Sequence, residues 1–154
     1  MANAVFTTEQ KPVFVYGTLR AGQGNYFAIL EGTTVQECDA VLDDYTLFGS
    51  GVPFAVQRDG RKVVGEVMDV DPELWAGVLH RLDRLEGYRG EGRNNMYDRK
   101  VRTVTLADGS TIEAYVYLAG ETSRRWFSDC EEIPGGDFVK AERGESVPFL
   151  GTSD

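Results

Sequence analysis

The 154-residue chain is long enough for one domain with a substantial hydrophobic core. Its composition, 42% apolar and 27% charged, is that of an ordinary globular protein, and 18 glycines against 5 prolines favour a structure rich in strands and turns. The net charge of −9 disfavours nucleic-acid binding, which normally needs a basic face.

The sequence carries no sign of a membrane span or of export. No apolar run approaches the roughly 20 residues of a membrane-spanning helix, and the first residues, MANAVFTTEQK, lack the charged start and apolar centre of a signal peptide. We therefore expect a cytoplasmic protein. Cys38 and Cys130 are far apart in the sequence, and two free thiols suit a reducing compartment better than a disulfide.

The first half of the chain is predicted to form mainly strands. Residues 1–11 are expected to be a flexible leader, followed by one domain over residues 12–154. In chain order we expect a short buried strand over 13–16, one or two helical turns over 25–30, a pair of strands over 33–51 with a break at Asp43–Asp44, and a hairpin over 53–70. The hairpin prediction rests on Asp59–Gly60, a dipeptide typical of two-residue turns.

The clearest helix is predicted to begin at Asp71. Asp71 suits the N-cap, Pro72 the first helical position, and Glu73 the positive end of the helix dipole. The helix is expected to run to about Leu85, with Gly87 as its C-terminal stop.

Strands and turns are predicted again after this helix. In chain order we expect a polar loop over 87–96, a hairpin over 97–120 with its turn at Asp108–Gly109, a helical segment over 123–127 and a turn over 133–138. A strand-rich order with one firm helix in the middle predicts a single α+β domain built around a twisted, barrel-like sheet.

One carboxylate continues the apolar face of the helix. Trp75, Leu79 and Leu82 lie on one face, and the next position of this pattern is Glu86. Burial and the negative end of the helix dipole would both raise the pKa of a carboxyl group there, and such a group can take up and return a proton. The alternative is a helix that ends one turn earlier and leaves Glu86 in solvent or paired with a neighbouring arginine.

Four short motifs occur in a characteristic order. They are VFVYGTLR at 13–20, LDRLEGY at 82–88, Tyr-Asp-Arg at 97–99 and AYVY at 114–117. In this order and at these separations they resemble the γ-glutamylcyclotransferase-like family, most closely its branch of γ-glutamylamine cyclotransferases and plant avirulence-induced-gene proteins. The resemblance covers roughly residues 12–140.

The resemblance implies a fold and a reaction. The fold is a small mixed β-barrel flanked by helices, with a cavity at one end. The reaction splits a γ-glutamyl amide through attack of its own α-amine on the γ-carbonyl, releasing 5-oxoproline and a free amine without water, a metal or a cofactor. By resemblance, Glu86 is the general acid/base, and the backbone of Tyr16, Gly17, Thr18 and Leu19 holds the substrate.

Several residues beside these motifs have two interpretations. Tyr115 and Tyr117 share one face of a strand; either both are half-buried barrel residues or one hydroxyl meets the substrate, and the resemblance favours Tyr117. Arg20 fits the mouth of the cavity or, better, an ordinary surface position. Asn25 fits a helix cap near the cavity.

Two further stretches bear on specificity. Residues 51–55 resemble a proline-bearing loop beside the cavity, although they also fit the start of a strand, and the loop over 89–95 is not assigned a role. Relatives that act on glutathione or free γ-glutamyl amino acids often read YGSN where this chain reads YGTL, which argues against glutathione and favours an amine-type or unknown acceptor.

The sequence thus predicts a cofactor-free cyclotransferase that acts on a small γ-glutamyl substrate and binds neither nucleic acid nor a membrane. One alternative is a non-catalytic module that binds or sequesters a small molecule on the same fold. Another is action on a larger γ-glutamylated molecule. His80 is the only histidine, and with two distant cysteines it supports neither a hydrolase triad nor a zinc site.

Overall fold

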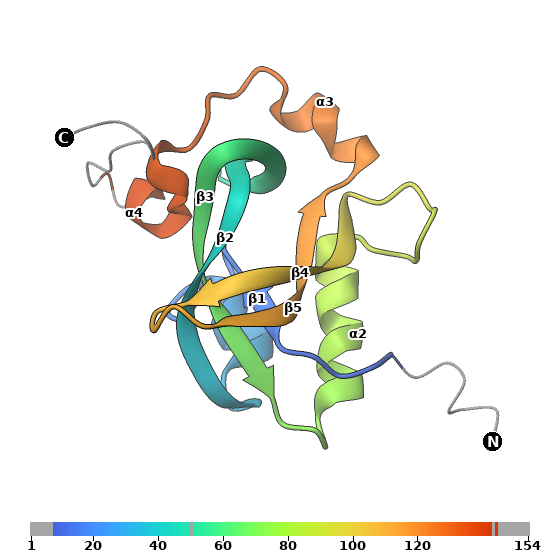
Figure 1. Cartoon of the computed structure of the whole chain (residues 1–154). Coiled ribbons are helices and arrows are strands. Elements are labelled where there is room, and N and C mark those ends of the chain that lie inside the picture. The colour runs from blue at the N-terminus through green and yellow to red at the C-terminus, as the bar shows by residue number, and fades with distance from the viewer. Residues whose placement is uncertain (1–7, 50, 143, 145–154) are drawn as a thin grey trace.

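A closed five-stranded barrel forms the centre of the molecule (Figure 1). The computed structural model describes residues 8–49, 51–142 and 144. The strands follow one another around the barrel in the order β1-β3-β2-β4-β5, with β1 parallel to β5 and the other pairs antiparallel. Their bounds are β1 (Val13–Val15), β2 (Thr34–Phe48), β3 (Phe54–Val70), β4 (Tyr97–Leu106) and β5 (Thr111–Ala119). The expected α+β domain with a small mixed barrel is confirmed.

Helical segments surround the barrel, and α2 is the longest of them. They are η1 (Tyr26–Leu30, a π-helix), α2 (Trp75–Glu86), η2 (Glu121–Ser123), α3 (Arg124–Phe127), η3 (Pro134–Gly136) and α4 (Phe138–Glu142). Figure 1 shows α2 alongside the barrel strands. Within the described ranges, every helix is too short or too polar to cross a membrane.

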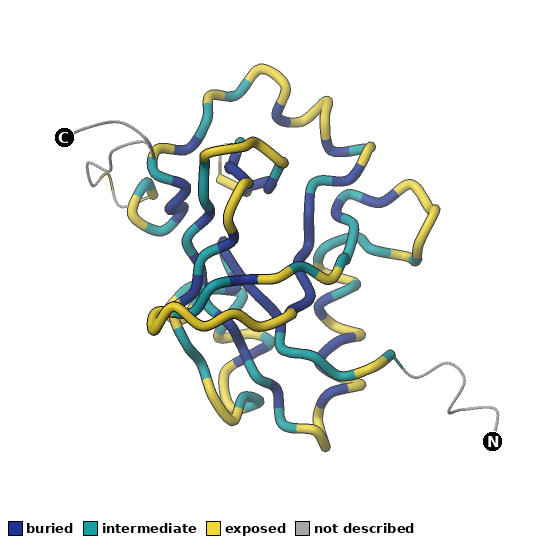
Figure 2. The backbone as a smooth tube through the Cα atoms, viewed as in Figure 1, coloured by how far each residue is buried: buried dark blue, intermediate teal, exposed yellow. Residues whose placement is uncertain are grey.

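Strand β1 is buried on both faces, which explains its uninterrupted run of apolar residues. Val13 and Val15 pack in a cluster with Trp75 and the buried face of α2. Phe14 and Tyr16 belong to a second cluster, to which all five strands contribute inside the barrel. Figure 2 shows the burial of each residue along the backbone, and all three residues of β1 are buried. The two-sided burial of β1 fixes the start of the YGTL loop that follows it.

The predicted strands between residues 33 and 70 are partly wrong. The sequence suggests a strand pair over 33–51 and a hairpin over 53–70. In the structure two long strands, β2 and β3, pair antiparallel with each other instead, and the chain reverses between the end of β2 and the start of β3.

The Asp59–Gly60 dipeptide bends β3 and does not reverse the chain. Residues 58–61 bulge out of the pairing opposite Asp44. Gly60 has a φ of 84° and Asp44 a φ of 66°, and the Gly60 N–H donates to Asp44 Oδ1 at 3.1 Å. An Asp-Gly dipeptide suits a bulge and a tight turn equally because both require positive φ.

The elements from residue 97 onward agree better with the predictions made from the sequence. Strands β4 and β5 form the predicted hairpin, whose turn at Asp108–Gly109 uses a φ of 90° at the glycine. The helical segment expected over 123–127 is present as the end of η2 and all of α3. Cys38 and Cys130 are free thiols, as expected.

The predicted leader is only partly described. Residues 1–7 lie outside the described residues. Three of the four residues that follow are hydrogen-bonded to the domain: Thr8 O accepts from Trp75 Nε1 at 3.1 Å, Glu9 O accepts from the Tyr115 hydroxyl at 2.6 Å, and Gln10 Nε2 donates to Val70 O at 2.6 Å.

Helix α2 begins later than predicted. Its first residue is Trp75, and Leu74 at the N-cap position makes no side-chain cap. Asp71 Oδ1 instead accepts the N–H of Glu73 at 2.9 Å, and the Asp71 carbonyl accepts the N–H of Leu74 at 2.9 Å. Asp71 therefore stabilises the turn before the helix, because its short side chain reaches the N–H group two residues on.

Gly87 ends α2 in the predicted place. It takes the left-handed conformation, with φ 68° and ψ 33°. Its N–H donates to Arg84 O at 3.3 Å, and the Tyr88 N–H donates to Asp83 O at 2.9 Å, which together form a Schellman motif. The helix consequently runs through Glu86, one residue beyond the predicted end.

Replacing Gly87 with alanine should destabilise this helix end. We expect Gly87→Ala to lower the free energy of unfolding by about 1–2 kcal/mol, because alanine is strained in the left-handed conformation, and its Cβ would lie 3.1 Å from Met96 Cβ. Gly77→Ala is the matched control. Gly77 is exposed in the same helix with open space around it, so alanine there should raise the free energy of unfolding by about 0.5–1 kcal/mol. Urea unfolding measures both, and a Gly87→Ala variant as stable as the wild type would contradict this account.

Candidate functional site

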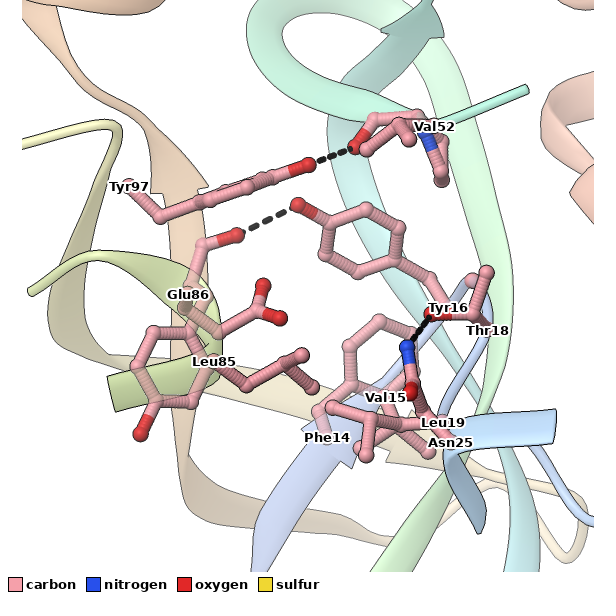
Figure 3. Close-up of a pocket in the computed structure, with 13 residues that line it drawn as sticks. Phe14, Val15, Tyr16, Thr18, Leu19, Asn25, Val52, Leu85, Glu86 and Tyr97 are labelled. Atoms are coloured by element: carbon pink, nitrogen blue, oxygen red, sulfur yellow. Dashed lines mark hydrogen bonds between the residues drawn. The ribbon is translucent and has the colours of Figure 1, made fainter. Parts of the chain in front are cut away.

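A cavity of about 200 Å³ lies between the end of α2 and the loop that follows β1 (Figure 3). It gathers residues from four parts of the chain: the β1 strand and its loop, the 52–53 turn, the end of α2, and the β4–β5 pair. The lining residues are Phe14, Val15, Tyr16, Gly17, Thr18, Leu19, Asn25, Val52, Pro53, Leu85, Glu86, Tyr97 and Tyr117. All six residues that the sequence assigns to the site, Tyr16, Gly17, Thr18, Leu19, Glu86 and Tyr117, are in this set.

Glu86 projects its carboxyl group into the cavity, toward the loop that carries Thr18 and Leu19 (Figure 3). Burial raises the pKa of Glu86 from 4.5 to about 7. In the part of the chain that the structure describes, its carboxylate takes part in no ion pair and accepts no hydrogen bond. Helix α2 runs through Glu86, and this residue lines the cavity without an ion pair to Arg84 or Arg89, so the alternative of a shorter helix that leaves Glu86 in solvent or paired with an arginine is wrong.

The residues of the loop after β1 that line the cavity carry backbone donors without an acceptor. Among the hydrogen bonds of the described residues, the N–H groups of Gly17, Thr18 and Leu19 have no acceptor. Carbonyl groups of the same loop are used: Gly17 O accepts the Arg20 N–H at 3.0 Å, and Thr18 O accepts the Asn25 N–H at 3.1 Å. The loop is thus held by its carbonyl oxygens, and three N–H groups remain available to a bound anion.

Close packing against Pro53 requires a glycine at position 17. Pro53 lies against it, so that a Cβ at Gly17 would lie only 2.7 Å from Pro53 Cγ. The proline-bearing loop over 51–55 therefore does lie beside the cavity, and it determines which residue the YGTL loop accepts at its second position.

Three tyrosine side chains line the cavity with their hydroxyl groups already bonded. Tyr16 donates to Tyr117 O, Tyr97 donates to Pro53 O at 2.6 Å, and Tyr117 donates to Asp83 Oδ1 at 2.6 Å. Burial raises the pKa of each hydroxyl well above its ordinary value, and the negative charge of Glu86 adds to the rise. These tyrosines stay neutral near pH 7, so Glu86 is the lining group that titrates there.

Of the other residues considered in the sequence, Asn25 lines the cavity, whereas Tyr115 and the 89–95 loop do not. Asn25 stands at the N-cap position of η1, but its side chain makes no cap there; its Nδ2 instead donates to Thr18 Oγ1 at 2.7 Å. Tyr115 stays outside: its ring stacks on Trp75 and its hydroxyl donates to Glu9 O at 2.6 Å. The 89–95 loop also contributes no lining residue.

Sequence reasoning missed several lining residues. Tyr97 opens one of the four motifs, and its position there is the signal in the sequence that identifies it. Phe14, Val15 and Leu85 carry no such signal, because apolar residues in a strand or helix look the same whether they face a core or a cavity. Among the described residues, no group of three or more His, Cys, Asp or Glu side chains is arranged to hold a metal ion.

Comparison with known proteins assigns the chain to a family. Residues 13–140 match the family described as gamma-glutamyl cyclotransferase, AIG2-like. The chain belongs to this family. The four motifs therefore identify it correctly, and the family indicates a γ-glutamylcyclotransferase-type enzyme.

Individual relatives agree with this assignment. The chain is 31% identical over 138 residues to the gamma-L-glutamyl-butirosin B gamma-glutamyl cyclotransferase of Niallia circulans, covering 88% of this chain and 85% of that protein. It is 37% identical over 129 residues to gamma-glutamylaminecyclotransferase B of Danio rerio, covering 75% and 63%. Its fold is similar to the crystal structure of an AIG2-like protein from Mus musculus, with a TM-score of 0.58 at 20% identity over 96% and 99% of the two chains.

The raised pKa of Glu86 predicts a pH-dependent stability. The folded protein binds this proton more tightly than the unfolded chain, so the stabilisation is full below about pH 4.5 and is lost as the pH rises through about 7. The shift corresponds to about 3 kcal/mol. We expect the stability of Glu86→Gln, relative to wild type, to increase by about that amount between pH 4.5 and pH 8.

Urea unfolding at several pH values measures this difference. Glu73→Gln is the control, because Glu73 is an exposed glutamate just before the same helix. A stability difference between Glu86→Gln and wild type that does not change with pH would show that the carboxyl group is not desolvated.

Proposed function

We propose that this protein is a γ-glutamyl cyclotransferase that converts a γ-glutamyl amide into 5-oxoproline and a free amine. The observation that carries the proposal is the position of Glu86, a carboxyl group with a pKa of about 7, across a small cavity from three unbonded N–H groups. The names of the relatives support the same reaction class: one acts on γ-L-glutamyl-butirosin B and the other is a γ-glutamylamine cyclotransferase.

Glu86 serves as base and then as acid. The α-ammonium group of the substrate loses a proton to the ionised carboxylate, and its nitrogen attacks the γ-carbonyl carbon. The new bond closes the five-membered ring, the protonated Glu86 gives its proton to the leaving nitrogen, and the bond from the γ-carbon to that nitrogen breaks. The ring nitrogen still carries two hydrogens after the attack; it gives one of them to the regenerated carboxylate, and this proton leaves with the released amine as its ammonium form. A pKa near neutrality suits both steps, since neither transfer is strongly uphill.

The YGTL loop receives the negative charge of the substrate. The N–H groups of Gly17, Thr18 and Leu19 suit the α-carboxylate or the oxyanion of the tetrahedral intermediate. Backbone donors fixed by the barrel hold the glutamyl chain in a folded shape without ordering a side chain. Because the nucleophile is part of the substrate, this orientation supplies much of the rate enhancement.

The cavity is large enough for the glutamyl half of the substrate only. At about 200 Å³ it is smaller than the roughly 300–1,000 Å³ of pockets for drug-sized ligands. We infer that it holds the glutamyl half while the acceptor amine projects from the mouth. Val52 and Leu85 line the cavity and are still 49% and 40% exposed, so the acceptor leaves past apolar side chains.

A product assay tests the reaction. Purified protein incubated with γ-glutamylamines and γ-glutamyl dipeptides should release 5-oxoproline, and Glu86→Gln should lower kcat by at least about 100-fold because the amide keeps the shape but cannot accept the proton. Glu73→Gln, remote from the cavity, should retain activity. Equal turnover by Glu86→Gln would rule out the mechanism. Calorimetric binding without any product from the wild type would instead support a non-catalytic binding module.

The pH dependence of the reaction should report the same group. The free enzyme needs Glu86 ionised, so kcat/KM is expected to rise with pH through about 7 and to level off above it. The facing tyrosines, Tyr16, Tyr97 and Tyr117, remain neutral in this range and add no step. A profile that is flat between pH 5 and pH 8 would contradict the assignment of the base.

A further inference from the structure

Arg20 follows the YGTL loop and forms an ion-pair cluster outside the cavity. Its Nε lies 3.1 Å from Glu66 Oε2, and its Nη1 lies 2.9 Å from Asp137 Oδ1. The side chains of Arg20, Glu66 and Asp137 are only 12%, 14% and 8% exposed, so solvent and salt screen this cluster far less than a surface pair. Arg20 therefore lies neither at the mouth of the cavity nor on the surface, contrary to both sequence-based interpretations.

Glu66 holds the end of the loop through both of its carboxylate oxygens. Oε2 accepts from Arg20 Nε, and Oε1 accepts the Ala21 N–H at 2.8 Å. The Arg20 N–H donates in turn to Gly17 O at 3.0 Å, which closes the turn. Glu66 lies on β3 opposite Val15 of β1. The turn is thus tied to the barrel at its end by Glu66 as well as at its start by β1.

Asp137 connects the same turn to the C-terminal part of the chain. Its Oδ1 also accepts the Lys140 N–H at 3.1 Å. The preceding Gly136 packs so closely against β3 that a Cβ there would lie 1.9 Å from Lys62 O. Because this segment is docked on the barrel by its own contacts, it presents Asp137 to Arg20 at a fixed position.

We propose that Arg20 is a positioning residue, which holds the N–H groups of Gly17, Thr18 and Leu19 in the direction of the cavity. Its planar guanidinium engages carboxylates from two separate segments at once, and the single ammonium of lysine cannot reproduce this geometry. The consequence for catalysis rests on the proposed function, in which these N–H groups bind the negative charge of the substrate. The effect on the shape of the turn is independent of the reaction.

Amide hydrogen exchange tests the turn directly. The Ala21 and Asn25 N–H groups are bonded within it, to Glu66 Oε1 and Thr18 O. In Arg20→Gln both should exchange at least about tenfold faster than in the wild type, while amides of the barrel strands stay unchanged. Asp137→Asn is the milder variant, since the pair with Glu66 remains, and we expect a smaller change in the same direction.

Arg102→Gln is the matched control for these variants. Arg102 is a half-buried arginine on β4 whose Nε donates to Tyr45 Oη at 2.9 Å, and it does not line the cavity. Its replacement removes a comparable side chain from the barrel. Exchange at Ala21 and Asn25 should be unaffected.

Steady-state kinetics tests the consequence for catalysis. Arg20→Gln should lower kcat/KM about 10-fold to 100-fold, mainly through a higher KM, because misplaced N–H groups bind the substrate less well. The rise of kcat/KM through pH 7 should persist, since Glu86 is untouched. Arg20→Lys should recover only part of the loss. If Arg20 only stabilised the fold, its replacement would lower the amount of folded protein and leave KM unchanged.

The outcomes are distinct. Unchanged exchange at Ala21 and Asn25 in Arg20→Gln overturns the proposal, and so does altered exchange with an unchanged KM. If Arg20→Gln does not fold, Asp137→Asn decides in the same way. If the wild type releases no 5-oxoproline from any substrate, the proposed function fails, while the exchange measurement still decides whether Arg20 positions the turn.

Discussion

The structure depends on keeping one ionisable carboxyl group inside an otherwise uncharged cavity. Raising the pKa of Glu86 to about 7 opposes folding by about 3 kcal/mol once the group is ionised. The same helix buries Trp75, Val78 and Leu82 against the barrel, and full burial of one such side chain contributes about 1.5–3 kcal/mol. The attachment of α2 therefore outweighs the cost. Gly87 ends the helix immediately after Glu86, so that the last turn cannot extend and carry the carboxylate elsewhere.

A second set of contacts fixes the rotation of this helix. Asp83, one turn before Glu86, accepts a hydrogen bond from the Tyr117 hydroxyl and pairs with Arg99. The guanidinium of Arg99 lies 4.8 Å from the ring centroid of Tyr88, just beyond the helix end. The last turn of α2 is thus attached to β4 and β5 by charged and aromatic contacts. The hydroxyl of Tyr117 is used in this attachment, so the part of Tyr117 that serves the cavity is its ring.

The sequence predicts well what is decided within a few residues. The spacing of the apolar residues and Gly87 together locate Glu86, because both depend on one helix. The Asp59–Gly60 dipeptide indicates positive φ correctly, but whether the chain then reverses depends on the opposite strand at Asp44, which the local pattern does not contain. Asn25 bonds to a residue seven positions earlier, so its capping pattern misleads. Arg20 is the extreme case: its two partners are 46 and 117 positions away, and no window of sequence contains them.

The proposed function requires one cavity to bind an anion beside a carboxylate of raised pKa, and the pairing of the arginines is compatible with both requirements. A cation that faced Glu86 would lower the pKa of its carboxyl group toward the ordinary value and make it a poorer proton carrier at neutral pH. Both arginines that support the walls are paired with carboxylates, Arg20 with Glu66 and Asp137, and Arg99 with Asp83. Burial accordingly accounts for the pKa of Glu86, with no basic residue opposing it. In the proposed function, recognition of a negative charge is left to neutral backbone N–H groups, and the role proposed for Arg20 is to hold those groups in place from outside the cavity.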